Sequence, residues 1–138
     1  MLQRIDAAWR DWLLAIEGIS EDRVDEPGVC GPWSVKDLVP HIALWDRQAV
    51  EDIDRHLAGL PARRNDWQRM NDDAARLSRP GVYRLQLVEM HDAHRRLLTA
   101  VRDLDDAMDP EAISDDTWGH YPEHTEQVRA WRTTNGLS

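Results

Sequence analysis

The sequence predicts an all-α fold, a four-helix bundle, and three observations support this prediction. Apolar residues recur at the three- and four-residue spacing of a helix in four segments, whereas no stretch keeps the strict alternation of a β-strand. The chain has 138 residues, which is the length of one domain. We therefore expect a single bundle domain over residues 1–138, with a longer crossover between its second and third helices.

The first helix is expected over residues 2–18. Its apolar positions follow one another at helical intervals, which places them on one face. These positions are Ile5, Trp9, Trp12 and Ile16. Gly18 suits the end of this helix, because glycine readily adopts the left-handed backbone found there. Residues 20–32 contain two prolines and two glycines, and this composition predicts a loop.

The second helix is expected over residues 34–58. Ser34 and Asp37 have the spacing of a capping box, in which two side chains bond the free amides at a helix start. Pro40 lies past the first turn, where a proline removes one backbone hydrogen bond and bends a helix. The apolar positions of this segment also lie at helical spacing: Leu38, Ile42, Trp45 and Ala49.

Two further helices complete the predicted bundle. Residues 65–77 are polar with weak periodicity, so the crossover is either a short helix or an ordered loop. The third helix is expected over residues 82–104, and the last one begins near residues 118–122 and continues to Arg132. Pro122 fits the first turn of this last helix, because the amide that proline lacks has no partner there.

Composition and charge exclude several classes of function. The chain has 17 basic and 26 acidic residues and a formal net charge of −9, which disfavours nucleic acid and an anionic membrane surface as partners. Its one cysteine, Cys30, excludes an internal disulfide and a thiolate metal cluster. Charged residues interrupt the start of the chain, and no apolar run approaches ~20 residues. We therefore expect a cytoplasmic protein without a signal peptide or a membrane span.

Three histidines are the strongest candidates for metal ligands. His120 and His124 are four residues apart, so on a helix their side chains are neighbours and can converge on one cation. His41 lies beside the apolar face of the second helix, and we expect it to supply a third ligand. Spacing alone leaves another interpretation open, in which His120 and His124 are surface or capping residues. A helix start also disfavours a cation, and nearby carboxylates such as Glu123 would offset this effect.

The other candidates favour structural roles. His94 falls on the apolar face of the third helix and is expected to be a core histidine held by a hydrogen bond, with His91 on its flank. His56 is expected at the end of the second helix, where its charged form suits the helix dipole. Cys30 is expected to be a spare thiol in a loop. The sequence contains no Gly-rich phosphate loop, no nucleophile elbow and no His-Glu-x-x-His motif.

Two segments resemble the DinB/YfiT-like metalloenzyme family. Residues 31–45, GPWSVKDLVPHIALW, resemble the second-helix signature of that family. Residues 119–131, GHYPEHTEQVRAW, resemble its last-helix segment with two histidines four residues apart. The order of the segments, the gap between them and the chain length also match, so the resemblance covers nearly the whole chain. Pro40 and Pro122 depart from the family's pattern.

This resemblance implies an up-down-down-up bundle that binds a divalent metal through three residues, matched here by His41, His120 and His124. Related proteins include mycothiol-dependent maleylpyruvate isomerases, enzymes that use other small thiols, and colibactin self-resistance hydrolases. The resemblance therefore implies a transferase that works with a low-molecular-weight thiol, or a hydrolase. Zinc, nickel and iron are the metals that we expect.

The expected function is thus that of a metal-dependent enzyme with open coordination positions for water or a thiolate. Asp37 and Glu123 are candidates for orienting the imidazoles, and Trp45 and Tyr121 are candidates for lining the pocket. The expected partner is a small-molecule substrate. The alternative is a non-catalytic bundle that sequesters a small molecule, and the sequence leaves a homodimer open in both cases.

Overall fold

The computed structural model describes residues 1–63 and 66–137. These residues form five α-helices and one 3-10 helix, and they contain no β-strand. The helices are α1 (Leu2–Ile16), α2 (Val35–Leu57), α3 (Trp67–Ser78), α4 (Tyr83–Arg102), η1 (Pro110–Asp116) and α5 (Tyr121–Thr134). The predicted all-α class is therefore confirmed. The four helices expected from the sequence correspond to α1, α2, α4 and α5, and the crossover adds α3.

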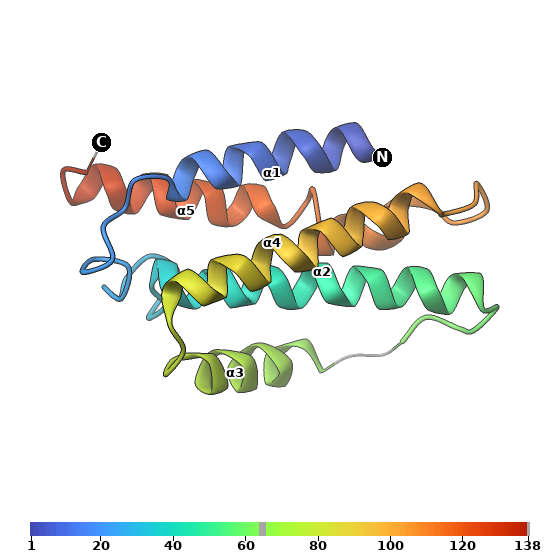
Figure 1. The fold of residues 1–138 in the computed structure, drawn as a ribbon, viewed down its shortest axis with the longest axis horizontal. Coiled ribbons are helices and arrows are strands. Elements are labelled where there is room, and N and C mark those ends of the chain that lie inside the picture. Colours follow the sequence, from blue (N-terminus) through green and yellow to red (C-terminus); the bar gives the residue numbers. More distant parts are fainter. Residues whose placement is uncertain (64–65, 138) are drawn as a thin grey trace.

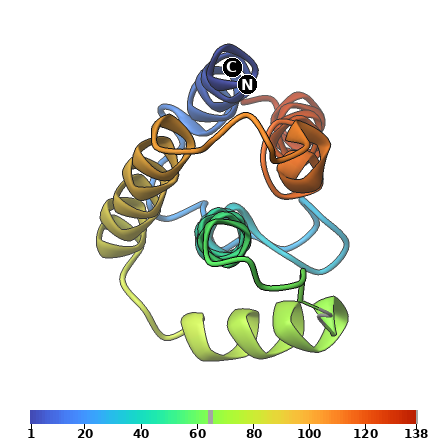
Figure 2. The same cartoon turned by 90° about the vertical axis from the view of Figure 1, so that its right-hand side faces the viewer.

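The other helices are arranged around α2. In the end-on view, α1, α4 and α5 lie on one side of α2, and α3 lies on the other (Figure 2). Along the bundle, α1 and α5 run in one direction while α2 and α4 run in the opposite one (Figure 1). This topology is possible because α3 carries the chain back along the bundle before α4 begins. It also brings α2 into contact with α5, where the site described below lies.

The core is formed by the apolar helix faces that the sequence predicts. The four positions predicted for α1 are all buried, and so are three of the four predicted for α2, where Trp45 is half-buried. Burying one such large side chain contributes about 1.5–3 kcal/mol to folding. Trp12 lies at the centre, and its Nε1–H donates to Sδ of Met90 at 3.3 Å. Within the described ranges, no helix combines the length and apolar character that crossing a bilayer requires.

The start of α2 has the capping box that the sequence predicts. The Ser34 hydroxyl accepts a hydrogen bond from the Asp37 amide at 3.1 Å, and the Asp37 carboxylate accepts one from the Ser34 amide at 3.0 Å. The helix then continues through Pro40 to Leu57. Pro40 therefore does not end the helix, and His41 directly after it is buried on the inward face.

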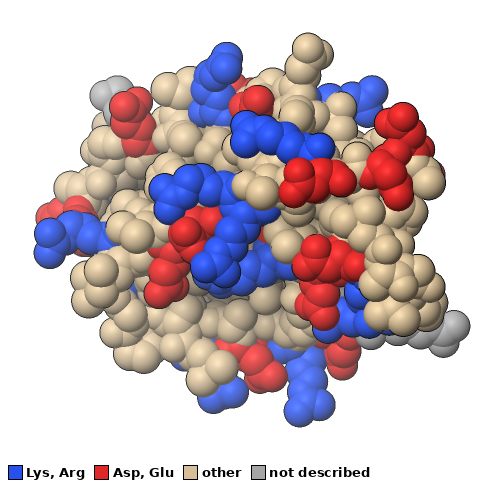
Figure 3. All heavy atoms as spheres, turned by 45° about the vertical axis from the view of Figure 1, so that its right-hand side comes forward, with Lys and Arg blue, Asp and Glu red and all other residues tan. Residues whose placement is uncertain are grey.

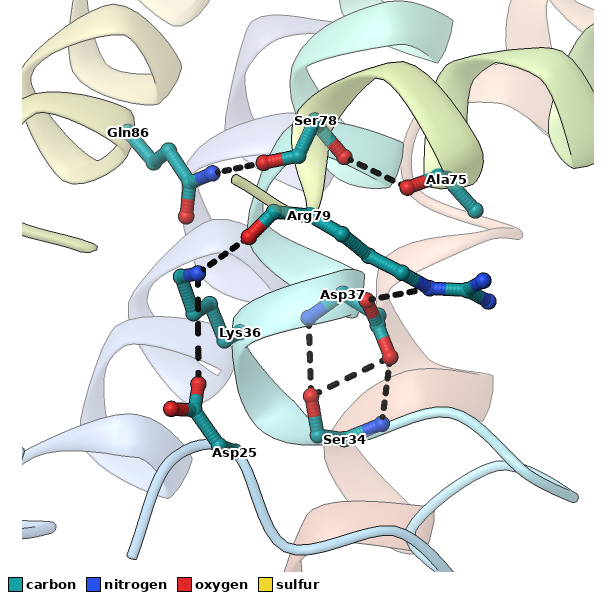
Figure 4. Close-up of polar contacts among 8 residues, drawn as sticks. All are labelled: Asp25, Ser34, Lys36, Asp37, Ala75, Ser78, Arg79 and Gln86. Carbon is teal, nitrogen blue, oxygen red and sulfur yellow. Dashed lines mark hydrogen bonds and ion pairs between the residues drawn. The ribbon is translucent and has the colours of Figure 1, made fainter. Parts of the chain in front are cut away.

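The crossover helix α3 is attached to the beginning of α2 (Figure 4). The Lys36 ammonium donates to the carbonyl of Arg79, directly after α3, at 2.7 Å, and the Arg79 guanidinium lies 3.8 Å from the Asp37 carboxylate. The buried residue of α3 is Ala75, so this helix contributes little to the core. The sequence allows either a short helix or an ordered loop for the crossover, and the structure shows the helix. Residue 65 of the predicted segment lies outside the described residues.

Candidate metal centre

Three histidines meet where α2 faces α5. His41 comes from α2, His120 directly precedes α5, and His124 lies in the first turns of α5. The Nε2 atom of His41 lies 2.9 Å from Nε2 of His120 and 3.1 Å from Nε2 of His124. The Nε2 atoms of His120 and His124 are 2.9 Å apart. The structure thus brings together the three residues that the sequence selects, in a group that could hold a metal ion.

The local backbone explains why the two histidines at α5 remain aligned. His120 has φ and ψ of −94° and −48°, which are close to helical values, so it keeps helical spacing to His124 although α5 begins at Tyr121. Pro122 lies in the first turn of α5, as predicted. Its missing amide has no intrahelical partner at that position, and the proline therefore does not disturb the pair.

Burial keeps the three imidazoles uncharged at neutral pH. His41 and His124 are 7% and 4% exposed, and His120 is half-buried. Burial, followed by the two neighbouring imidazoles, lowers the pKa of His41 to about 2. Burial and then His124 lower the pKa of His120 to about 3, against an opposing effect of the Asp116 backbone. Burial also lowers the pKa of His124. Each uncharged ring has one nitrogen lone pair to offer.

Hydrogen bonds alone cannot satisfy the three ring nitrogens. The Gln127 amide oxygen lies 2.7 Å from Nδ1 of His124, so this nitrogen donates and Nε2 of His124 keeps its lone pair. At most two protons, those of His41 and His120, are then available for three Nε2–Nε2 contacts. Nδ1 of His41 is also buried without a hydrogen-bond partner. A cation removes the conflict among the three Nε2 atoms, because it accepts a lone pair from every ring.

The spacing of the nitrogens also fits a divalent metal. A cation about 2.0–2.1 Å from each nitrogen would form N–metal–N angles of roughly 90–100° across the observed separations of 2.9–3.1 Å. Three ligands at such angles occupy one side of the coordination sphere and leave the other side open. Imidazole ligands suit zinc, nickel and iron, and open positions are typical of a catalytic metal site.

A cavity of about 780 Å³ opens at the three histidines. This volume lies in the range of small-molecule pockets. Three tryptophans line it: Trp33 from the loop before α2, Trp45 from α2 and Trp67 from α3. Trp45 is held in place because its Nε1–H donates to Oδ1 of Asn71 on α3 at 2.8 Å. The wall of the cavity therefore combines the bundle with the crossover helix.

Of the candidate residues around the metal centre, the structure places Trp45 and Glu123 on this cavity and Tyr121 elsewhere. Tyr121 is fully buried, and its hydroxyl donates a hydrogen bond to the carboxylate of Asp46 on α2. The expectation that Tyr121 lines the pocket is therefore corrected, because its side chain points into the bundle while the neighbouring His120 faces the cavity.

The contact that orients an imidazole also differs from the expected one. Asp37 closes the capping box with Ser34 and lies near Arg79, so its carboxylate is engaged at the helix start rather than at a ring. Among the described residues, Glu123 has no hydrogen bond to an imidazole. The Gln127 amide oxygen makes the orienting contact instead, at Nδ1 of His124.

A second buried polar cluster lies beside the three histidines. The carboxylate of Asp46, which has no exposed surface, accepts a hydrogen bond from Tyr121 and lies 3.1 Å from Nδ1 of His94 on α4. The His94 ring stacks on Trp9 of α1, with ring centroids 3.7 Å apart. His94 is thus the hydrogen-bonded core histidine that the sequence predicts. Because Tyr121 follows His120, this cluster fixes the start of α5 against α2 and α4.

Sequence reasoning missed Asp46, Gln127 and Trp67. Asp46 lies four residues after Ile42 on the buried face of α2, and a carboxylate at such a position is a signal that could have identified it. Gln127 lies three residues after His124, a spacing at which helical side chains meet. Trp67 belongs to the crossover, where weak periodicity gives no indication of the face that is covered.

The fold and the three converging imidazoles define an all-helical domain that could hold a metal ion. The chain belongs to the DinB-like family of the mycothiol maleylpyruvate isomerase N-terminal domain, whose family model matches residues 5–134. It is also similar in fold to a crystal structure of an uncharacterised protein from Escherichia coli UTI89. The TM-score is 0.82 at 19% sequence identity, and the alignment covers 99% of this chain and 93% of the other. Among curated proteins, none matches this chain.

Proposed function

We propose that this protein is a metal-dependent enzyme that transfers a small thiol or hydrolyses a small-molecule substrate. The proposal depends on one observation, the convergence of the His41, His120 and His124 Nε2 atoms within 3.1 Å of one another. Three uncharged imidazoles suit zinc, nickel or iron. The family is named for mycothiol maleylpyruvate isomerase, and this supports a low-molecular-weight thiol as cosubstrate.

The residues of the site have distinct roles in this proposal. His41, His120 and His124 would hold the metal, and the chemistry that it would supply is a water or thiol nucleophile at neutral pH. Gln127 holds the proton of His124 on Nδ1 and thereby directs Nε2 toward the metal. The imidazoles line the 780 Å³ cavity, and a substrate approaches them from it. The half-buried Trp45 restricts the access of bulk water to this approach.

The metal assignment is tested by titrating metal-free protein with zinc or nickel and measuring the bound element by mass spectrometry. We expect one ion per chain. His124→Ala should weaken binding roughly 70- to 900-fold, because structural zinc sites with four ligands gain about 10–16 kcal/mol, or roughly 2.5–4 kcal/mol per ligand. His56→Ala is the matched control, since His56 bonds Asp105 near the C-terminal end of α2 and lies outside the centre.

Two results would contradict the proposal. Metal uptake below about 0.2 equivalents would favour the alternative, a bundle that sequesters a small molecule without catalysis. Tight binding that persists in His124→Ala would mean that the ligand set is wrong. With metal uptake established, a panel of thiol-conjugation and hydrolysis reactions, each run with metal-loaded and metal-free protein, separates transfer from hydrolysis.

A further inference from the structure

The cavity over the three histidines is lined by many more acidic groups than basic ones. Asp72 from α3, Asp115 and Asp116 from η1, and Glu123 from α5 all line it. The basic side chain on its wall in the described ranges is Arg63. Asp72, Asp115 and Glu123 are exposed, whereas the histidines lie deeper, so the acidic groups surround the entrance to the cavity.

These four acidic groups have no basic partner in the part of the chain that the structure describes. In the described ranges, the side chain of none of the four takes part in an ion pair or a hydrogen bond. Some acids outside the cavity are paired: Asp92 lies 3.1 Å from Arg95 and 3.2 Å from Arg96, and Asp73 lies 3.4 Å from Arg76. On the face drawn in Figure 3, basic and acidic side chains are interspersed in this way. The entrance to the cavity therefore carries carboxyl groups that pair with no basic side chain of the described residues.

The one basic group of the wall does not offset these acids. The Arg63 guanidinium lies 2.7 Å from a carboxylate oxygen of Glu51, which lies outside the lining, so its charge is already compensated. A divalent metal on the histidines would add two positive charges at the deep end of the cavity. Burial, followed by neighbouring carboxylates, raises the pKa of Asp116 to about 7, so its charge is incomplete at neutral pH. The other three carboxyl groups of the wall still outnumber these two charges, and they are exposed.

The tryptophans supply the apolar part of the same wall. Trp33 and Trp45 are half-buried, and Trp67 is 58% exposed beside the acidic entrance. Tryptophan faces bind both apolar groups and organic cations, the latter through the negative face of the ring. The cavity thus combines exposed acidic groups, an aromatic wall and the three buried or half-buried histidines.

We propose that the cavity selects a small organic cation, such as an amine with an apolar body, and rejects carboxylate-bearing molecules. The cationic group would lie against Asp72, Asp115 and Glu123, the apolar body against the tryptophans, and the reacting group at the histidines. This inference rests on the proposed function, because it names the substrate class of the same site. Its test must therefore separate selection by charge from binding of metal.

The test compares three probes of the same shape and different charge. These are 2-phenylethylamine (cationic), 2-phenylethanol (neutral) and 3-phenylpropionate (anionic), and their binding is followed by quenching of tryptophan fluorescence. We expect the amine to bind about tenfold more tightly than the carboxylate, with the alcohol between them, in both metal-free and metal-loaded protein. The ratio of the affinity for the amine to that for the carboxylate should fall as salt is added, because the cavity carboxylates are exposed and salt screens their charges.

Two double variants decide whether the cavity acids cause this preference. Asp72→Asn with Asp115→Asn should reduce the ratio to about threefold or less. The matched control is Asp73→Asn with Asp92→Asn, which removes the same charge outside the cavity and should leave the ratio unchanged. Circular dichroism checks that both variants keep their helical content.

Three outcomes would overturn the inference: equal or tighter binding of the carboxylate, a ratio unaffected by the cavity variant, or no binding of any probe at about 10 mM. The proposed function fails separately. A chain that prefers the amine but takes up no metal would contradict the metal-dependent enzyme and leave the charge selection standing. A chain that takes up metal but shows no charge preference would contradict the charge selection and leave the metal-dependent enzyme standing.

Discussion

Two buried polar clusters lie side by side on α2, one around His41 and one around Asp46. They differ in how well their hydrogen-bond donors match their acceptors. The Asp46 carboxylate faces two donors within the protein, the Tyr121 hydroxyl and Nδ1 of His94. His41 faces two further imidazoles whose Nε2 atoms compete for the same protons. Both clusters are removed from water, yet only the first is assembled from complementary partners.

This difference distinguishes a cluster with matched partners from a group of side chains that could hold a metal ion. Buried polar groups in native proteins are almost always hydrogen-bonded, and each exception calls for an explanation. The Asp46 cluster meets this rule at its carboxylate, although Nε2 of His94 is buried without a hydrogen-bond partner, and it links α1, α2, α4 and α5. The His41 cluster breaks the rule in a way that an external cation would repair. Removing or titrating one cluster at a time tests this contrast between the Asp46 and His41 clusters.

The largest effect on stability is expected from Asp46→Ala. It leaves the Tyr121 hydroxyl and Nδ1 of His94 buried without their acceptor, and we expect the free energy of unfolding to fall by about 3 kcal/mol. Urea unfolding of the metal-free protein measures this change. A loss below about 1 kcal/mol would show that the cluster does not stabilise the bundle in the way that its burial indicates.

Acidification of the metal-free protein is expected to lower its free energy of unfolding by a smaller amount. The pKa of His41 is about 2 in the folded protein and near 6.5 in the unfolded chain, so the unfolded chain binds the extra proton below pH 6.5. Stability is therefore fully retained above that pH and decreases as the pH falls from about 6.5 toward 2. For this ring we expect a loss of about 1–2 kcal/mol between pH 7 and pH 5.

His41→Leu provides the control for this pH effect. Between pH 6.5 and 5, the pH dependence of its unfolding free energy should be weaker than that of the unchanged protein by about one proton. Parallel urea titrations at several pH values, with a chelator present, measure both slopes. Identical slopes would mean that His41 is not buried in its uncharged form.

The smallest effect is expected from His41→Leu at pH 7.5 without metal. The substitution removes the ring in conflict and leaves His120 and His124, whose Nε2 atoms can share one hydrogen bond at 2.9 Å. The free energy of unfolding should then change by less than about 1 kcal/mol, in either direction. A loss comparable to that of Asp46→Ala would make the His41 cluster a structural element and remove the contrast between the two clusters.

The sequence predicts the parts of this structure that repeat with the helical period. The buried face of α1 and the capping box at Ser34 follow from local spacing, and the four-residue interval between His120 and His124 survives in the fold. Local patterns suffice in these cases because neighbours along a helix contact one another irrespective of what the helix packs against.

The contacts that the sequence does not predict join distant parts of the chain. Tyr121 is expected at the pocket, but it turns inward to Asp46, which lies 75 positions earlier, and the partner of a buried hydroxyl cannot be read from local spacing. The same holds for the cavity wall. Trp67 and Asp72 lie on a predominantly polar helix, and their position at the cavity depends on where α3 is attached, which local sequence does not indicate.

The attachment of α3 has a consequence for how such a protein diversifies. This helix adds one buried residue, Ala75, to the interior, yet it supplies Trp67, Asn71 and Asp72 to the cavity wall. Substitutions on its cavity-facing side would thus change the shape and charge of the cavity wall without replacing the three histidines. Evolution can therefore vary the cavity wall on α3 separately from the histidines held between α2 and α5.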